Sequence, residues 1–336
     1  GAPARPAASG RRGRPSSDRP LEMVPLAADQ RALLEGIPNE DTPRTERFYF
    51  RSNEWRQDLL RPHLVGLGGA YLGVGSDQNY TMAAMARSEV LYLVDFDARI
   101  RAVHRVYGAL LRATDDPEGL IARFHPDQAA ETRRLLAEAL ADDPDRDTAL
   151  EIFRRHHAAW HTYLDRVERM RWEGRAVSWL GDPGLFRHVR DLFRADRVVA
   201  RTGDVTSPEV LQEVAGSATR LGVPVRVVYF SNAEQFFTYT DAFVANMDAL
   251  PTDERSILVR TIRHRRIPKA PRGRWHYMVH HFPDFLERLE TGAYPRSFTL
   301  VADLLAAGAP FLGQDGLSTM TRDTPRRMLE RLRASR

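Results

Sequence analysis

Short apolar runs that alternate with helical segments are the feature that most constrains the fold of this chain. Residues 90–96, VLYLVDF, are almost continuously apolar, which suits a strand buried on both faces of a sheet. Apolar residues with helical spacing follow directly over residues 98–113. Repeated strand–helix units of this kind predict an α/β fold: a Rossmann-like, mostly parallel sheet with helices on both faces. Further strands are predicted at 70–73, 198–201, 225–230, 256–262 and 297–301, and further helices at 27–37, 54–64, 78–87, 233–248 and 283–291, with another beginning at Ser207 and Pro208.

A long, charged and helical stretch interrupts this alternation. Residues 115–195 contain two Asp-Asp-Pro turn signals. We interpret this stretch as a helical insertion within one domain that spans residues 25–320. Residues 1–24 are rich in Ala, Pro, Arg, Gly and Ser and cannot bury enough apolar surface to offset the entropy of ordering, so a disordered tail is expected there. Residues 321–336 are expected to form a basic helix or tail.

Composition excludes several classes of site and partner. The chain has no cysteine, which excludes disulfides, thiolate metal sites and cysteine nucleophiles. No apolar run approaches the roughly 20 residues that cross a bilayer, so no integral membrane segment is expected. The net charge of +4 comes from the two arginine-rich tails, and the acidic body that remains does not favour nucleic-acid binding. Neither a Gly-x-Ser-x-Gly elbow nor a P-loop is present.

The loop after the first predicted strand has features of a cofactor-binding loop. Gly73 and Gly75 allow a tight turn and a close approach of the backbone to a ligand, and the following helix begins with free N–H groups. Asp95 lies 22 positions after Gly73, which matches the spacing of an acidic residue that binds a ribose diol. The alternative for the glycine loop is an ordinary strand–helix turn with Ser76 or Asp77 as the helix N-cap. The alternative for Asp95 is a solvated strand end.

Polar residues also follow the later strands. Asp204, in RTGDV, suits either an adenine amino group or a simple turn. The loop YFSNAEQFF places Ser231, Asn232, Glu234 and Gln235 between aromatic pairs, a composition that suits a small-molecule pocket. Alternatively, Ser231 and Glu234 form a helix-capping box, which leaves Asn232 and Gln235 unexplained.

Three basic features remain. The arginine-rich stretch 260–274 could attract an acidic substrate or form a solvated loop. His276, between two aromatic residues, is a candidate general base or a packed histidine. His157 and His161 lie one helical turn apart without a zinc-protease pattern around them, so no metal site is expected.

Taken in this order, the loops resemble those of class I S-adenosylmethionine-dependent methyltransferases. More narrowly, YLGVGSDQNY, RTGDVTSPEVL and VYFSNAEQFF resemble an uncharacterised bacterial family with that Rossmann-like fold, some of whose members are described as putative lipoproteins. The resemblance covers roughly residues 48–290. It implies that the cofactor is S-adenosylmethionine, that the Ser231–Gln235 loop faces the transferred methyl, and that Asp77 stands where many methyltransferases have a third glycine. The resemblance implies these cofactor-binding residues: Gly73, Gly75 and Asp77 at the methionine end, Asp95 at the ribose and Asp204 at the adenine.

Two functions from different classes follow. The first is methyl transfer from S-adenosylmethionine to a small molecule in the cytoplasm, with Tyr80, Ser231, Asn232 and Gln235 binding the substrate. Glu234 or His276 would then remove any proton. The second is a non-catalytic ligand-binding protein on the same fold, possibly exported or lipid-anchored. A nicotinamide enzyme is a third alternative, although the loop lacks the last glycine of that fingerprint. Nothing in the sequence indicates the oligomeric state.

Overall fold

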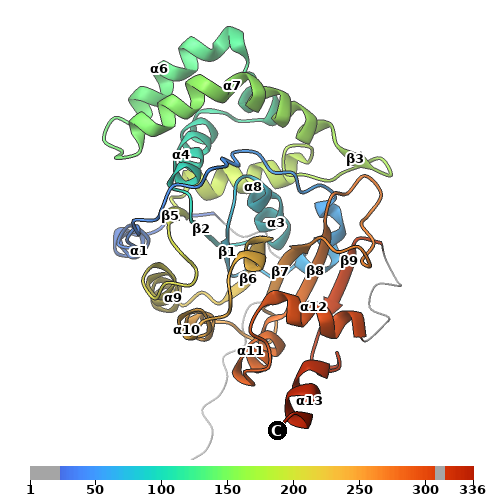
Figure 1. Ribbon diagram of the computed structural model, residues 1–336. Coiled ribbons are helices and arrows are strands. Elements are labelled where there is room, and N and C mark those ends of the chain that lie inside the picture. The colour runs from blue at the N-terminus through green and yellow to red at the C-terminus, as the bar shows by residue number, and fades with distance from the viewer. Residues whose placement is uncertain (1–22, 307–314) are drawn as a thin grey trace, which may run out of the picture.

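The computed structural model describes residues 23–306 and 315–336 of the 336-residue chain. The predicted disordered tail falls almost wholly on residues 1–22, which lie outside the described residues. Within the described residues the protein is an α/β structure built on one seven-stranded sheet (Figure 1). Its strands are β1 (Ala70–Gly73), β2 (Val90–Asp95), β5 (Val198–Thr202), β6 (Val225–Ser231), β7 (Ile257–Ile262), β8 (His276–His281) and β9 (Leu317–Met320).

The sheet is mostly parallel, as the alternation predicts. Its strand order is β5-β2-β1-β6-β7-β8-β9. The first five of these strands are parallel to one another, whereas β8 is antiparallel to β7 and β9 is parallel to β8. Counted along the chain, this sheet begins 3-2-1-4-5, the order of doubly wound folds, so the arrangement is consistent with a Rossmann-like fold. The order reverses between β1 and β6, which is where such folds bind ligands.

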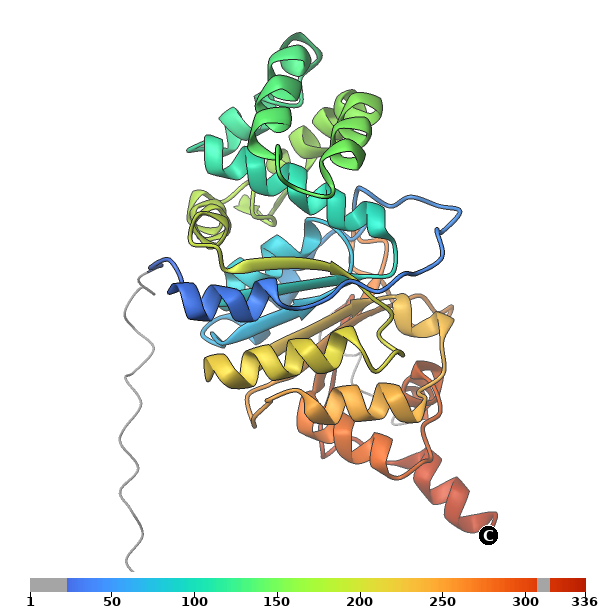
Figure 2. The same ribbon diagram turned by 90° about the vertical axis from the view of Figure 1, so that its left-hand side faces the viewer.

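Each face of the sheet carries its own hydrophobic core because successive strand residues point to opposite faces. Tyr71, Leu91 and Leu93 face one core, and Leu72 and Tyr92 face the other. Figure 2 shows the sheet with helices above and below it. The first face is covered by α3 (Gln78–Ala86), α4 (Ala98–Ala113) and α8 (Pro183–Arg194), and the second by α1 (Ala28–Glu35), α9 (Val210–Leu221), α10 (Asp241–Ala249), α11 (Phe282–Glu290) and α12 (Ser297–Ala306).

The stretch interpreted as an insertion contains two parts that differ in position. α6 (Ala129–Ala139) and α7 (Arg146–Arg169) lie at the top of the molecule in Figure 1, and α7 packs on α4. α8, in contrast, packs on α3 and α4 and so covers the sheet itself. Between them lies a two-stranded hairpin. The remaining elements are η1 (Gln57–Leu60), α2 (Arg61–Leu64), α5 (Pro117–Ala122), η2 (Pro126–Gln128), the hairpin strands β3 (Arg171–Trp172) and β4 (Arg175–Ala176), η3 (Ala233–Phe236), and α13 (Arg327–Ala334) within the predicted basic C-terminal segment.

At the C-terminal end of the sheet one sequence prediction is wrong and two strands were not predicted. Residues 297–301, expected to be a strand, form the first half of α12. Leu300, Val301 and Leu304 of this helix are buried, a spacing that belongs to one helical face rather than to a strand. The strands β8 and β9, which have no counterpart in the sequence prediction, complete the sheet instead.

Candidate functional site

The candidate site lies at the carboxyl edge of the parallel strands, where the loops after β1, β2, β5, β6 and β7 gather. The structure brings most of the predicted site residues to this edge in two separate groups, and Asp204 and His276 lie outside both. One group surrounds the glycine loop after β1, and the other surrounds the loops after β6 and β7.

The glycine loop is covered by a side chain of the helix that follows it. Asn79 Nδ2 donates to the carbonyls of Val74 and Ser76, both at 2.8 Å, and Asn79 Oδ1 accepts from the Tyr71 hydroxyl at 2.8 Å. A Cβ atom at Gly73 would collide with this Asn79 side chain. Gly73 therefore makes room for Asn79, which is fully buried.

Asp77 is enclosed by residues of the helical stretch 115–195, which interrupts the strand–helix alternation. Only 1% of its surface is exposed, and its carboxylate accepts from the Tyr163 hydroxyl at 2.8 Å and from Trp179 Nε1 at 3.3 Å. Tyr163 comes from α7, and Trp179 precedes α8. Burial raises the pKa of Asp77 to about 6, and these donors offset part of that rise. The loop is thus tied to the helices above it.

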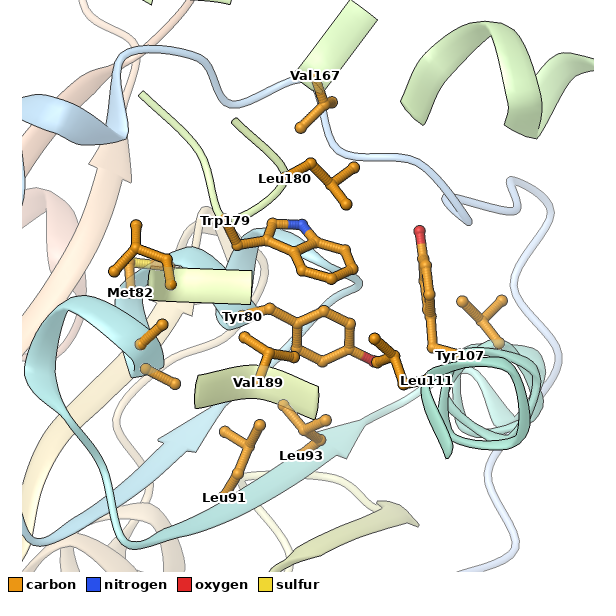
Figure 3. Packing of buried hydrophobic residues seen from close by; sticks show 14 of the residues in the cluster. Tyr80, Met82, Leu91, Leu93, Tyr107, Leu111, Val167, Trp179, Leu180 and Val189 are labelled. Atoms are coloured by element: carbon orange, nitrogen blue, oxygen red, sulfur yellow. The ribbon is translucent and has the colours of Figure 1, made fainter. Parts of the chain in front are cut away.

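Tyr80, a predicted substrate-binding residue, lies in an aromatic cluster whose member Trp179 also donates to Asp77. Its ring makes edge contacts with Tyr107 and Trp179, as the close view in Figure 3 shows. Its hydroxyl lies 2.6 Å from His104 Nδ1, and His104 Nε2 lies 2.9 Å from the Gly75 carbonyl. Since a carbonyl only accepts, Nε2 carries the proton and Nδ1 accepts from Tyr80. Burial lowers the pKa of His104 to about 4, which keeps it in this neutral form.

Asp95 binds the backbone of its own neighbourhood. Its two carboxylate oxygens accept from the N–H groups of Gly75 at 2.8 Å and Asp97 at 2.9 Å. Burial raises the pKa of Asp95 to about 6 despite these two bonds. Asp95 therefore fixes the tip of the glycine loop against the end of β2.

Asp204, the predicted adenine ligand, closes a local turn. Its carboxylate accepts from the backbone N–H and the hydroxyl of Thr206, at 2.8 and 2.7 Å. Its own N–H and that of Val210, at the start of α9, donate to Glu40. Glu40 was not predicted, because no local pattern marks a residue that reaches a helix 170 positions further along the chain.

The residues around the glycine loop do not fit S-adenosylmethionine in this conformation. The cavity beside Asp77 and Gln78 has a volume of about 20 Å³, which is room for about one water molecule. Asp95 already accepts from the N–H of Gly75, and the Asn79 side chain fills the space over Gly73. The cofactor roles of Gly73, Gly75, Asp77, Asp95 and Asp204 stay predictions.

The second group of residues lines an open pocket of about 280 Å³. Ser231 ends β6 with a left-handed backbone, φ +51°, where the pairing with β7 shifts register. Strained backbone of this kind is held in place by its surroundings and concentrates at functional sites. The loop that follows, and the loop between β7 and β8, bring polar and basic groups together around the pocket. Its lining includes Ser231, Asn232, Glu234, Gln235, Arg260, Thr261, Arg263, His264, Arg296, Ser297 and Phe298.

Glu234 forms the buried floor of this pocket. Its carboxylate accepts from Arg260 Nε at 2.6 Å and Nη2 at 3.2 Å, and from the Tyr239 hydroxyl at 2.7 Å. Both side chains of the Glu234–Arg260 pair are only 2% exposed. Arg260 also donates to His280 Nδ1 at 3.2 Å, and His280 Nε2 donates to Asp284 at 2.7 Å. Glu234 is therefore held by a network that continues into α11.

His276 lies apart from both groups of residues. It is fully buried, with Nδ1 donating to the Pro268 carbonyl at 2.7 Å and Nε2 at 2.7 Å from the Ser318 hydroxyl. Burial lowers its pKa from the ordinary value. In this position His276 joins the β7–β8 loop to β9, and its role as a general base stays a prediction.

Glu54 is the site residue that the sequence analysis missed. It is 6% exposed and accepts from the hydroxyls of Tyr229 and Ser231, so it lies between the glycine loop and the open pocket. Burial raises its pKa, and the hydroxyl donors counteract that rise. Its nearest partners lie 175 and 177 positions away in the sequence, and no local signal announces them.

Two further predictions concern metals and membranes. His161 meets the ring of His125, and His157 Nδ1 lies 3.3 Å from the Phe124 carbonyl. In the part of the chain that the structure describes, no three His, Asp or Glu side chains gather as a metal site would require. Across residues 23–306 and 315–336, every helix is too short or too polar to cross a membrane.

Comparison with known proteins shows a family but no activity. No curated protein matches this sequence. The family resemblance noted above is supported only in its coarser form, because the matching family carries no methyltransferase description. Residues 49–321 match a family described as a domain of unknown function (DUF7790), and the chain belongs to that family.

Proposed function

We propose that this protein binds a small carboxylic acid, without transforming it, in the pocket at the carboxyl ends of β6 and β7. The observation that carries the proposal is the contrast between two loops of one sheet edge. The glycine loop encloses room for about one water molecule, whereas the Ser231–Gln235 loop opens onto about 280 Å³. A pocket with a few convergent polar groups at the carboxyl edge is the default binding site of such a fold.

The charge of the pocket favours an acidic ligand. Arg263 and Arg296 line it from two different loops, and both side chains are exposed. Among the residues that the structure describes, neither has an acidic partner. A guanidinium fork binds a carboxylate through two parallel hydrogen bonds. The buried Arg260, by contrast, is already neutralised by Glu234.

Uncharged groups supply the remaining recognition. Asn232 and Gln235 offer amide donors and acceptors at the rim, and Ser297 offers a hydroxyl at the start of α12. Phe298, which is 61% exposed, provides an apolar wall for the carbon skeleton of a ligand. This mixture of apolar surface with a few placed polar groups is typical of small-molecule pockets.

The two predicted bases, Glu234 and His276, are both engaged by neighbouring groups, which favours binding over catalysis. Glu234 is engaged on both oxygens by Arg260 and Tyr239. His276 is enclosed on both ring nitrogens by Pro268 and Ser318. Neither group has a free atom directed at the pocket from which it could take a proton in this conformation.

The test is calorimetric titration with glutarate and succinate, chosen as acids that fit the pocket volume. We expect binding that weakens at least tenfold in Arg263→Ala/Arg296→Ala. The matched control is Arg133→Ala/Arg134→Ala on the exposed side of α6, which removes the same charge elsewhere. Equal affinity in both double variants, or no binding of either acid at millimolar concentration, would contradict the proposal.

A further inference from the structure

A second concave surface lies outside the carboxylate pocket. It is a cleft of about 520 Å³, within the size range of small-molecule sites, and it shares no lining residue with that pocket. Its walls come from residues 55–56, the end of α7, the β3–β4 hairpin and the loop between β7 and β8. Figure 1 shows this last loop, in orange, beside the hairpin at the end of α7. We call this surface the arginine cleft.

Five arginines and one aspartate line the arginine cleft. The arginines are Arg56, Arg166, Arg169, Arg171 and Arg272, and the carboxylate is Asp165. Three of the arginines have acidic partners: Arg169 pairs with Asp165 at 2.7 Å, Arg56 with Asp58 at 2.9 Å and Arg171 with Glu168 at 3.6 Å. Among the residues that the structure describes, Arg166 and Arg272 have no acidic partner. These two unpaired guanidinium groups leave a net positive charge at the concavity, which attracts an anion.

Aromatic and apolar groups form the floor of the same cleft. The Arg166 guanidinium lies 4.6 Å from the centre of the Trp55 ring, which orients it without neutralising it. Met170 and Val177 add apolar surface next to Trp55. The cleft thus offers cationic groups beside an apolar floor, which suits a ligand that is charged at one end only.

Backbone strain marks two of the arginines. Arg56 and Arg272 have φ values of +66° and +60°, in the left-handed region that favours glycine. The two positions are joined, because Arg56 Nη1 donates to the carbonyl of Pro271 at 3.0 Å. Strain of this kind concentrates at ligand sites. Here it falls at two arginines that line one cavity.

We propose that the arginine cleft binds a small organic phosphate. The phosphate group would lie between Arg166 and Arg272, and the organic part would lie against Trp55 and Met170. Phosphate suits the cleft better than a single carboxylate does, because its two charges and three terminal oxygens can satisfy several guanidinium forks at once. The site is independent of the carboxylate pocket.

Phenyl phosphate is the probe that tests both halves of this site, with inorganic phosphate and phenol as its separate parts. By calorimetry at low salt, we expect phenyl phosphate to bind at least tenfold more tightly than inorganic phosphate, and phenol not to bind. Arg166→Ala/Arg272→Ala should weaken phenyl phosphate at least tenfold. Trp55→Leu should remove most of its advantage over inorganic phosphate.

Two controls keep the test decisive. Arg133→Ala/Arg134→Ala removes two exposed charges from α6, and Arg263→Ala/Arg296→Ala removes two from the carboxylate pocket. Both should leave phenyl phosphate affinity within about twofold of the unaltered protein, and thermal melting confirms that each variant is folded. No binding at millimolar concentration, or equal weakening by all three double variants, would overturn the proposal.

Discussion

Asp77 is a carboxylic acid held in a nearly dry position without a counterion. In the described part of the chain no Arg, Lys or His pairs with it, and its partners are the uncharged donors Tyr163 and Trp179. Burying a charged carboxylate without a cation is costly, so the protonated form is favoured in the folded state. The pKa of Asp77 is therefore raised to about 6.

The pH dependence of stability should reveal Asp77. Its pKa is raised from 3.8 to about 6, so the folded state binds a proton more tightly than the unfolded state does. The stabilisation is present below about pH 4 and is lost as pH rises through about 6. We expect the unfolding free energy of the unaltered protein, minus that of Asp77→Asn, to fall by about 2–3 kcal/mol between pH 4 and pH 8.

Chemical denaturation at several pH values measures this difference. Comparing the two proteins cancels the contributions of other carboxyl groups, such as Asp145. The pKa of Asp145 is below its ordinary value, because hydrogen bonds and charges from Arg101 outweigh the effect of its burial. A difference that stays constant or rises with pH would show that Asp77 is charged without penalty in the folded protein.

Gly73 is a second residue whose role can be tested. We expect Gly73→Ala to lower the unfolding free energy by about 1–3 kcal/mol, because a methyl group there displaces the buried Asn79. Gly216→Ala in α9 is the control, since its Cβ meets nothing closer than an Arg220 nitrogen at 3.4 Å. Alanine in that helix should be neutral or stabilising by up to about 1 kcal/mol. Equal effects of the two substitutions would mean that Asn79 does not cover the glycine loop.

At the scale of elements, a buried charge network joins the C-terminal half of the fold. It runs from Glu234 in η3 through Arg260 in β7 and His280 in β8 to Asp284 in α11. Although burial alone would raise it, the pKa of Asp284 is lowered to about 2 by hydrogen bonds from His280 and Arg288. Such networks stabilise only while every charge keeps its partner.

Removing one partner should therefore cost more than removing both. We expect Glu234→Gln to lower the unfolding free energy by about 3–5 kcal/mol, because Arg260 is left as an uncompensated buried charge. The double variant Glu234→Gln/Arg260→Met should recover most of that loss. Glu35→Gln, in the exposed pair with Arg31, should change stability by less than about 1 kcal/mol. A double variant less stable than Glu234→Gln would contradict this account, as denaturant melts would show.

The same half of the chain shows where sequence reasoning stops. The strands β1, β2, β5, β6 and β7 are apolar enough to be predicted within one or two residues of their observed bounds. β8 has the sequence HYMVHH, and its histidines conceal a strand because each finds its partner only in the folded protein. The β-branched residues of α12 suggested a strand, but packing of its helical face decided otherwise.

The candidate site was predictable to a similar extent. The rule that ligands bind at the carboxyl ends of strands directed attention to Ser231, Asn232 and Gln235, and the structure places all three around one pocket. The closure of the glycine loop was not predictable, since Tyr163 and Trp179 reach Asp77 from 86 and 102 positions away. Contacts over such distances leave no local sequence signal.

At the scale of the whole molecule, the sheet edge is divided into a closed centre and open flanks. The glycine loop, Glu54 and the aromatic residues around Tyr80 fill the point where the strand order reverses. The carboxylate pocket and the arginine cleft lie outside this closed centre, and each has two exposed arginines that lack acidic partners among the described residues. This division is the reason for proposing ligand binding outside the usual cofactor position.

The most direct test of this account is calorimetric titration with S-adenosylmethionine and S-adenosylhomocysteine, alongside Asp95→Ala. The account predicts no heat and no thermal shift at millimolar ligand, because the chain's own side chains occupy the glycine loop. Asp95→Ala should only destabilise the protein, through the lost bonds to Gly75 and Asp97. Micromolar binding that Asp95→Ala abolishes would contradict the account and would make the glycine loop a working cofactor site.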